Sequence, residues 1–105
     1  MRETDFQKEI INDLKQTLKG CIIVKNDSGY IQGIPDLLVL YKDKWAALEC
    51  KVSHATKKQP NQEYYVKLMD EMSFSRFVYP ANKEEVLDAL QRSFLSERTT
   101  RVSRS

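Results

Sequence analysis

The sequence has few of the residues on which several protein classes depend. Its 105 residues include two cysteines and one histidine, too few for a disulfide framework and at spacings that match no zinc-binding pattern. No apolar run approaches the roughly 20 residues that cross a membrane, and the first residues lack the apolar stretch of a signal peptide. We therefore expect a cytoplasmic protein without membrane contact, in which Cys21 and Cys50 are small buried apolar side chains.

An excess of charge of one sign is also nearly absent. The net charge is +2, and the last ten residues contain three arginines and one glutamate, so residues 1–95 are formally neutral. Charge alone therefore names no partner. We expect a single domain over residues 1–95 and a flexible basic tail over residues 96–105, which would either contact phosphate or only aid solubility.

Hydrophobic periodicity predicts an α/β fold with the element order α-β-β-β-α-β-α. In the last helix, Asn82 is the expected N-cap and Glu85 would complete a capping box. Strands flanked by helices in this order indicate a central mixed sheet with helices packed against it. The predicted helices cover about residues 3–19, 60–73 and 82–94, and the predicted strands cover residues 21–24, 37–41, 45–52 and 76–79.

The first predicted helix carries an acid on its apolar side. With about 100° per residue, the apolar side chains that follow Phe6 fill an arc of about 140°, and Glu3 falls inside it. Glu9 and Asp13 fall outside this arc, although Glu9 would replace Glu3 if the helix register differed. A carboxylate facing the core must be paired, protonated or bound to a metal. Alternatively, Glu3 lies in a fraying first turn and reaches water, where an acid suits the helix dipole.

Two predicted strands also carry charge within apolar surroundings. Asp36 opens the apolar run 37–40, while Glu49 and Lys51 are two residues apart and share one face of their strand. An edge strand with one solvated face is the ordinary alternative. Oxygen ligands without clustered sulfur or imidazole suit Mg²⁺ or Mn²⁺, which can polarise a phosphoryl oxygen while a lysine offsets developing charge. The three carboxylates of Glu3, Asp36 and Glu49, together with Lys51, are therefore suited to phosphodiester hydrolysis.

These residues resemble the signature of the PD-(D/E)XK nuclease superfamily. The resemblance consists of Gly33-Ile34-Pro35-Asp36, twelve intervening residues and Glu49-Cys50-Lys51. The sequence is more closely similar to the VRR-NUC family, in its small phage and bacterial branch, through Glu3-Thr4-Asp5-Phe6-Gln7 and Pro60-Asn61-Gln62. The resemblance spans roughly residues 3–80 and implies a restriction-endonuclease-like core.

The resemblance also implies a role for each matching position. Lys51 would be the catalytic lysine, and Gln62 would line the site and steady that lysine or the attacking water. Gln59 is the alternative to Gln62, although the Pro-x-Gln order favours Gln62. The metal site would consist of Asp36, Glu49, the backbone carbonyl of Cys50, and Glu3 either directly or through water.

The sequence departs from the family directly after the lysine. Residues 52–58 replace the usual glycine and serine, and they include His54, Lys57 and Lys58. We interpret these three residues, together with Gly33, as an edge of the site that contacts DNA. A solvated run of charge is the alternative interpretation.

The function implied by the resemblance is a Mg²⁺-dependent DNA endonuclease. Stand-alone members of this branch resemble structure-specific enzymes that act as homodimers on branched or Holliday-junction-like DNA. A chain of this size has no room for a separate recognition domain, which favours recognition of DNA shape through phosphates. Two alternatives stay open: a catalytically silent module that binds DNA or protein, and a restriction or repair nuclease that acts on duplex or flap DNA.

Overall fold

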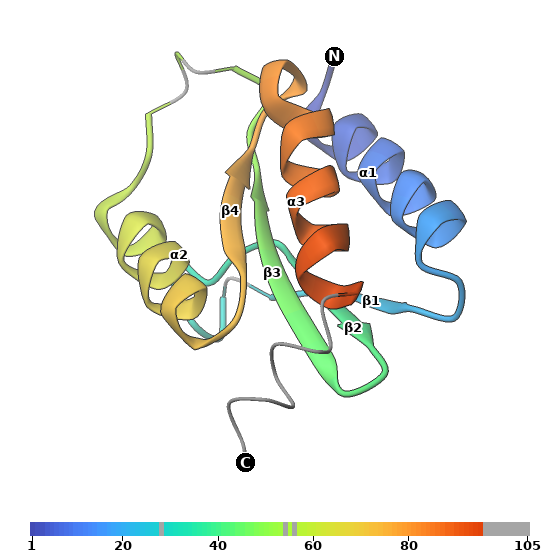
Figure 1. Cartoon of the computed structure of the whole chain (residues 1–105). Helices are drawn as coiled ribbons and strands as arrows, with labels where there is room; N and C mark the ends of the chain where they lie inside the picture. Colours follow the sequence, from blue (N-terminus) through green and yellow to red (C-terminus); the bar gives the residue numbers. More distant parts are fainter. Residues whose placement is uncertain (28, 54, 56, 96–105) are drawn as a thin grey trace.

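A four-stranded sheet with helices on both faces forms the described part of the chain, residues 1–27, 29–53, 55 and 57–95 of a computed structural model (Figure 1). The order confirms the predicted α/β fold and adds one short 3-10 helix, η1, before the last helix. The elements are α1 (Glu3–Thr17), β1 (Ile22–Lys25), β2 (Leu37–Tyr41), β3 (Lys44–Cys50), α2 (Pro60–Met72), β4 (Ser75–Val78), η1 (Pro80–Asn82) and α3 (Lys83–Leu95).

The sheet is mixed and has the strand order β1-β2-β3-β4. The first two pairings are antiparallel, whereas β3 and β4 are parallel and are joined by α2. β2 and β3 form a hairpin whose turn contains Lys42 with a positive φ of 57°. Since β3 lies between β2 and β4, the alternative of an edge strand for Glu49 and Lys51 is wrong.

The core lies between the sheet and the pair α1 and α3, while α2 covers part of the opposite face (Figure 1). Side chains of β3 alternate, so that Leu48 and Cys50 enter the core and Glu49 faces the side of α2. Cys50 is fully buried as predicted, and burial raises the pKa of its thiol, whereas Cys21 is only half-buried. The buried set includes Phe6, Ile10, Leu14, Leu18, Leu37, Val39, Ala46, Leu48, Val78, Val86, Leu90 and Phe94.

An ion-pair cluster connects α1 to the start of α3. Lys83 Nζ lies 2.7 Å from Glu9 Oε2 and 2.7 Å from Asp13 Oδ2. The two acids lie outside the apolar arc of α1, as the periodicity predicts. Glu9 is therefore engaged with α3, on the side of α1 outside the apolar arc.

The start of α3 differs from the prediction. Asn82 does not form a capping box with Glu85, because its side chain bonds the preceding chain instead. Its Oδ1 accepts a hydrogen bond from the Tyr79 N–H at 2.7 Å, and its Nδ2 donates to the Phe77 carbonyl at 3.3 Å. These bonds stabilise η1, which continues directly into α3.

The predicted basic tail, residues 96–105, lies outside the described residues. Over the part of the chain that is described, no helix has both the length and the apolar character needed to cross a membrane.

Candidate active site

The β2–β3 hairpin explains the spacing between the two strand carboxylates. Leu37 pairs with Leu48. The same register therefore places Asp36 opposite Glu49, one position further from the turn of the hairpin. The Cys50 N–H donates a hydrogen bond to Asp36 Oδ2 at 3.0 Å, which fixes the Asp36 carboxylate beside the end of β3.

Glu3 joins these two residues from the first turn of α1. One carboxylate oxygen from each of Glu3, Asp36 and Glu49 lies within 4.8 Å of the other two. Glu3 remains exposed, so it both reaches the cluster and touches water. Partial burial raises the pKa of Glu3, repulsion from Asp36 raises it further, and attraction to Lys51 opposes both.

Glu49 is the most buried of the three acids, with only 3% of its surface exposed. Its Oε2 accepts a hydrogen bond, but its buried Oε1 has no hydrogen-bond partner among the described residues. Burial raises the pKa of Glu49 to about 8, with added repulsion from Asp36 and Glu3 and opposing attraction to Lys51. A buried carboxylate with an unsatisfied oxygen is costly unless it gains a proton or a cation.

Lys51 follows β3 directly and is 5% exposed. Its N–H donates to the Val78 carbonyl at 2.9 Å, which continues the pairing of β3 with β4 beyond the strand. The charge of Lys51 lowers the pKa of both Glu49 and Glu3. Lys51 and Glu3, the glutamate at the start of α1, therefore lie in the same small region, although they are far apart in sequence.

Gln62 connects the start of α2 to this region. Its Nε2 donates to Glu49 Oε2 at 3.1 Å, and its Oε1 accepts from the Gln59 N–H at 3.1 Å. The second bond holds the amide in one orientation within the first turn of the helix. Gln62 therefore orients Glu49, and its role in steadying Lys51 or the attacking water stays a prediction. Gln59 supports Gln62 through its backbone.

The loop before β2 is held by a residue that the sequence analysis did not select. Asn26 Nδ2 donates to the Pro35 carbonyl at 2.8 Å, and the Asn26 N–H donates to the Asp36 carbonyl at 2.8 Å. Asn26 thereby fixes the backbone from which Asp36 projects. The sequence signal was weak, because only the β1–β2 register brings Asn26 next to Asp36.

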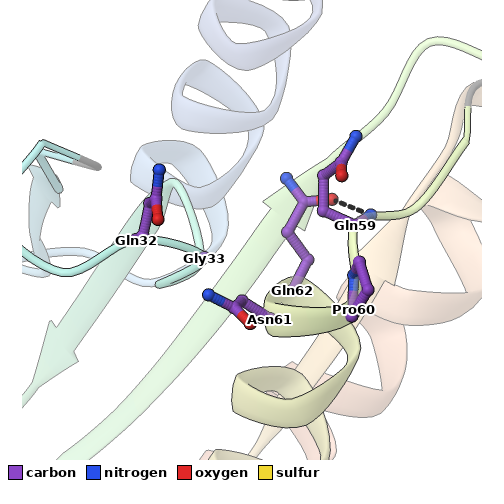
Figure 2. Close-up of a pocket in the computed structure, with 6 residues that line it drawn as sticks. All are labelled: Gln32, Gly33, Gln59, Pro60, Asn61 and Gln62. Atoms are coloured by element: carbon purple, nitrogen blue, oxygen red, sulfur yellow. Dashed lines mark hydrogen bonds between the residues drawn. The ribbon is translucent and has the colours of Figure 1, made fainter.

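Gly33 packs this loop against α2. Its φ is +91°, and a Cβ at this position would lie 2.4 Å from Asn61 Cβ, so a side chain does not fit. Figure 2 shows Gly33 on its loop beside Asn61 at the start of α2, and both residues line a cleft. The glycine therefore has a packing role, and the predicted contact of Gly33 with DNA stays a prediction.

Comparison with known proteins identifies the fold. No family model and no curated protein match the sequence. A solved structure named "VRR_NUC domain protein" superposes with a TM-score of 0.66 over 89% of this chain and 88% of that chain, at 17% sequence identity. The chain therefore shares the fold of that structure. The sheet and helices form the restriction-endonuclease-like core that the sequence resemblance implied.

The remaining predicted site residues lie on the segment after Lys51. Lys58 Nζ lies 4.5 Å from the centre of the Phe77 ring, and Phe77 pairs with Glu49 across β3 and β4. Lys58 is therefore held against the sheet near the carboxylates by a cation–π contact. Lys57 is exposed, and His54 lies outside the described residues, so their contact with DNA stays a prediction.

Proposed function

We propose that the protein is a metal-dependent DNA endonuclease in which Glu3, Asp36 and Glu49 hold Mg²⁺ or Mn²⁺. The observation that carries this proposal is the convergence of three carboxylate oxygens within 4.8 Å of one another. The buried Oε1 of Glu49 has no hydrogen-bond partner among the residues described, which suits a position that binds a cation. An all-oxygen donor set is also the one that Mg²⁺ and Mn²⁺ prefer.

The surrounding residues have separate roles in this proposal. Asp36 and Glu49 are held in place by hydrogen bonds from the Cys50 N–H and from Gln62. The Cys50 carbonyl is proposed as a further ligand, and Glu3 contributes directly or through water. A divalent cation bound there would polarise a phosphoryl oxygen of the substrate. Lys51 would orient the attacking water or offset the negative charge that develops on the phosphorus oxygens.

The proposed substrate is branched DNA, cut by a homodimer. Two copies would bring two sites to two opposed strands. Apolar side chains available for contact between copies include Ile22 and Val24 on the edge strand β1, which are 61% and 41% exposed. Light scattering on the purified protein tests this part, and a monomer at micromolar concentration would contradict it.

Cleavage of a panel of labelled DNA substrates tests the proposal as a whole. The panel contains duplex, flap, splayed-arm and four-way DNA, each incubated with Mg²⁺, with Mn²⁺ and with EDTA. We expect metal-dependent incision, fastest on branched DNA, and its loss in Lys51→Ala without a change in the unfolding transition. If Lys51→Ala cuts as well as the parent protein, the assignment is wrong. If no substrate is cut but DNA still binds, the protein is a silent nuclease-fold module.

A further inference from the structure

A polar cleft lies beside the carboxylate cluster, between the loop before β2 and the first turn of α2. Its volume is about 390 Å³, within the range of roughly 300–1,000 Å³ that is typical of small-ligand sites. Gln62 belongs to both regions, because it lines the cleft and donates a hydrogen bond to Glu49. The lining residues are Gln32, Gly33, Gln59, Pro60, Asn61 and Gln62 (Figure 2).

The chemistry of this lining differs from that of a phosphate site. None of the six lining residues is ionisable, whereas phosphates are bound mainly by lysine and arginine. Four of the six carry side-chain amides, each of which presents a donor and an acceptor next to each other. This pairing matches the edge of a nucleobase, and asparagine and glutamine bind adenine in this way through its N6 and N7.

Two of these amides are available to a ligand. Gln62 is already engaged through both ends of its amide. The side chains of Gln32 and Asn61 make no hydrogen bond to any other residue within the described ranges. In Figure 2, Gln32 stands on one side of the gap and the residues of α2 stand on the other. A flat ligand between them would therefore meet amides from two separate elements.

We propose that this cleft is a subsite for one unpaired nucleobase next to the scissile phosphate, bound at its edge by Gln32 and Asn61. The assignment of this base to a DNA strand rests on the proposed function. An unpaired base enters at the lowest cost, because a base within a duplex must first lose its stacking and pairing. The subsite would thereby give the enzyme a preference for bulged and branched DNA over continuous duplex.

Binding to two bulged duplexes tests this subsite. The probe is a fluorescein-labelled duplex with one bulged adenosine, and its partner carries an abasic analogue at the same position, so that the phosphates are identical. Anisotropy is measured with Ca²⁺ in place of Mg²⁺ so that binding is followed without cleavage. We expect the parent protein to prefer the adenosine probe by about tenfold, the scale of one good bidentate contact. Gln32→Ala and Asn61→Ala should each reduce this preference towards one.

A matched glutamine outside the cleft serves as the control. Gln16 is exposed on α1, about 20 Å along the helix from Glu3, and Gln16→Ala should keep the full preference. Equal affinity of the parent protein for the two probes would overturn the subsite, even where Mg²⁺-dependent cleavage of DNA is present. A preference that survives in both Gln32→Ala and Asn61→Ala would also overturn it.

Two further results separate this inference from the proposed function. A base preference that Gln32→Ala removes, in a protein that cuts no DNA, would support the subsite and refute the nuclease. Competition with adenosine 5′-monophosphate distinguishes a free nucleotide from a base on a strand. We expect the bulged duplex to bind more tightly, and tighter binding of the free nucleotide would overturn the assignment to DNA.

Discussion

Two acidic clusters of similar composition lie along α1, one near its middle and one at its start. Near its middle, Glu9 and Asp13 share Lys83, with both oxygens 2.7 Å from Nζ. At its start, Glu3 joins Asp36 and Glu49 near Lys51. In the first cluster the lysine contacts both acids directly. In the second, Glu49 Oε1 is buried without a hydrogen-bond partner among the described residues.

The pKa shifts in the two clusters also have different causes. Hydrogen bonds with Asp13 and Glu9 raise the pKa of Lys83, which is the behaviour of a satisfied ion pair. Burial instead raises the pKa of Glu49 to about 8, despite the attraction of Lys51. The first cluster therefore stabilises the contact between two helices, whereas the second contains a buried carboxyl group that lacks a partner for one of its oxygens among the described residues. A carboxyl group perturbed by burial and by neighbouring charges is a candidate for a functional site, here the proposed cation site.

The largest expected effect comes from removing one charge from each cluster. Asp36→Asn keeps an oxygen that can accept the Cys50 N–H but removes a proposed ligand. We expect Mn²⁺ binding by calorimetry to be lost and cleavage to fall about 10³-fold, because a bound ion supplies several kcal/mol of charge stabilisation. The thermal unfolding transition should change little.

Asp13→Asn is the matched control for this change. It removes the same charge from the ion-pair cluster with Lys83, so cleavage and Mn²⁺ binding should be unchanged. If both variants lose cleavage to the same extent, then the two clusters do not have separate roles and the comparison fails.

A second comparison uses two glycines with nearly the same backbone conformation. Gly20 and Gly33 have φ values of +90° and +91°, but a Cβ meets nothing within 4 Å at Gly20 and lies 2.4 Å from Asn61 Cβ at Gly33. Gly20→Ala should therefore cost only the strain of a left-handed residue, about 1–2 kcal/mol. Gly33→Ala should cost more and should also lower cleavage, because the loop that carries Asp36 must move. Chemical denaturation and the cleavage assay measure the two effects, and equal costs would contradict the packing role of Gly33.

Much of this fold was predictable because its signals are local. Helical spacing of apolar residues predicted α1, and β-branched runs separated by polar turns predicted the hairpin of β2 and β3. The strand pattern placed Asp36 and Glu49 on the two strands of this hairpin, and the helical arc placed Glu3 on the apolar side of α1 while leaving a solvent-facing first turn as the alternative. Each of these steps needs only the geometry of one element or of one pair of strands, whereas the joint role of the three acids came from the family resemblance.

Most of what the sequence did not predict depends on contacts between distant segments. The exception is Asn82, which bonds Tyr79 and Phe77 just before it because η1 precedes α3 directly. The hydrogen bond from Gln62 to Glu49 depends on how α2 packs on the sheet. Asn26 acts on Pro35 and Asp36 only because β1 pairs with β2. Spacing within the sequence carries no information about such contacts.

The pH dependence of stability gives a third and smaller effect. Unfolding returns Glu49 from a pKa of about 8 to its ordinary value of 4.5, so between these values the folded protein holds a proton that the unfolded chain lacks. The metal-free protein should therefore lose stability as pH rises from about 4.5 to about 8. Glu49→Gln should flatten this dependence, and Mg²⁺ should oppose it in the parent protein alone. Melting temperatures from pH 5 to pH 9 measure it, and equal slopes in parent and variant would refute this account of Glu49.

The smallest effect should come from the satisfied cluster. Lys83→Met keeps most of the side-chain packing but removes both ion pairs, whose acids are 40% and 38% exposed and therefore partly screened by water. Lys83 also lies at the positive end of the α3 dipole, so its removal relieves an unfavourable interaction. We expect a net loss of about 1 kcal/mol or less, smaller in high salt, with cleavage unchanged. Because the pKa of Lys83 is raised above 10.5, this stabilisation is present below that pH and is lost as pH rises through the folded value. A large loss of cleavage in Lys83→Met would show that the α1–α3 contact positions Glu3, and the two clusters would then act as one unit.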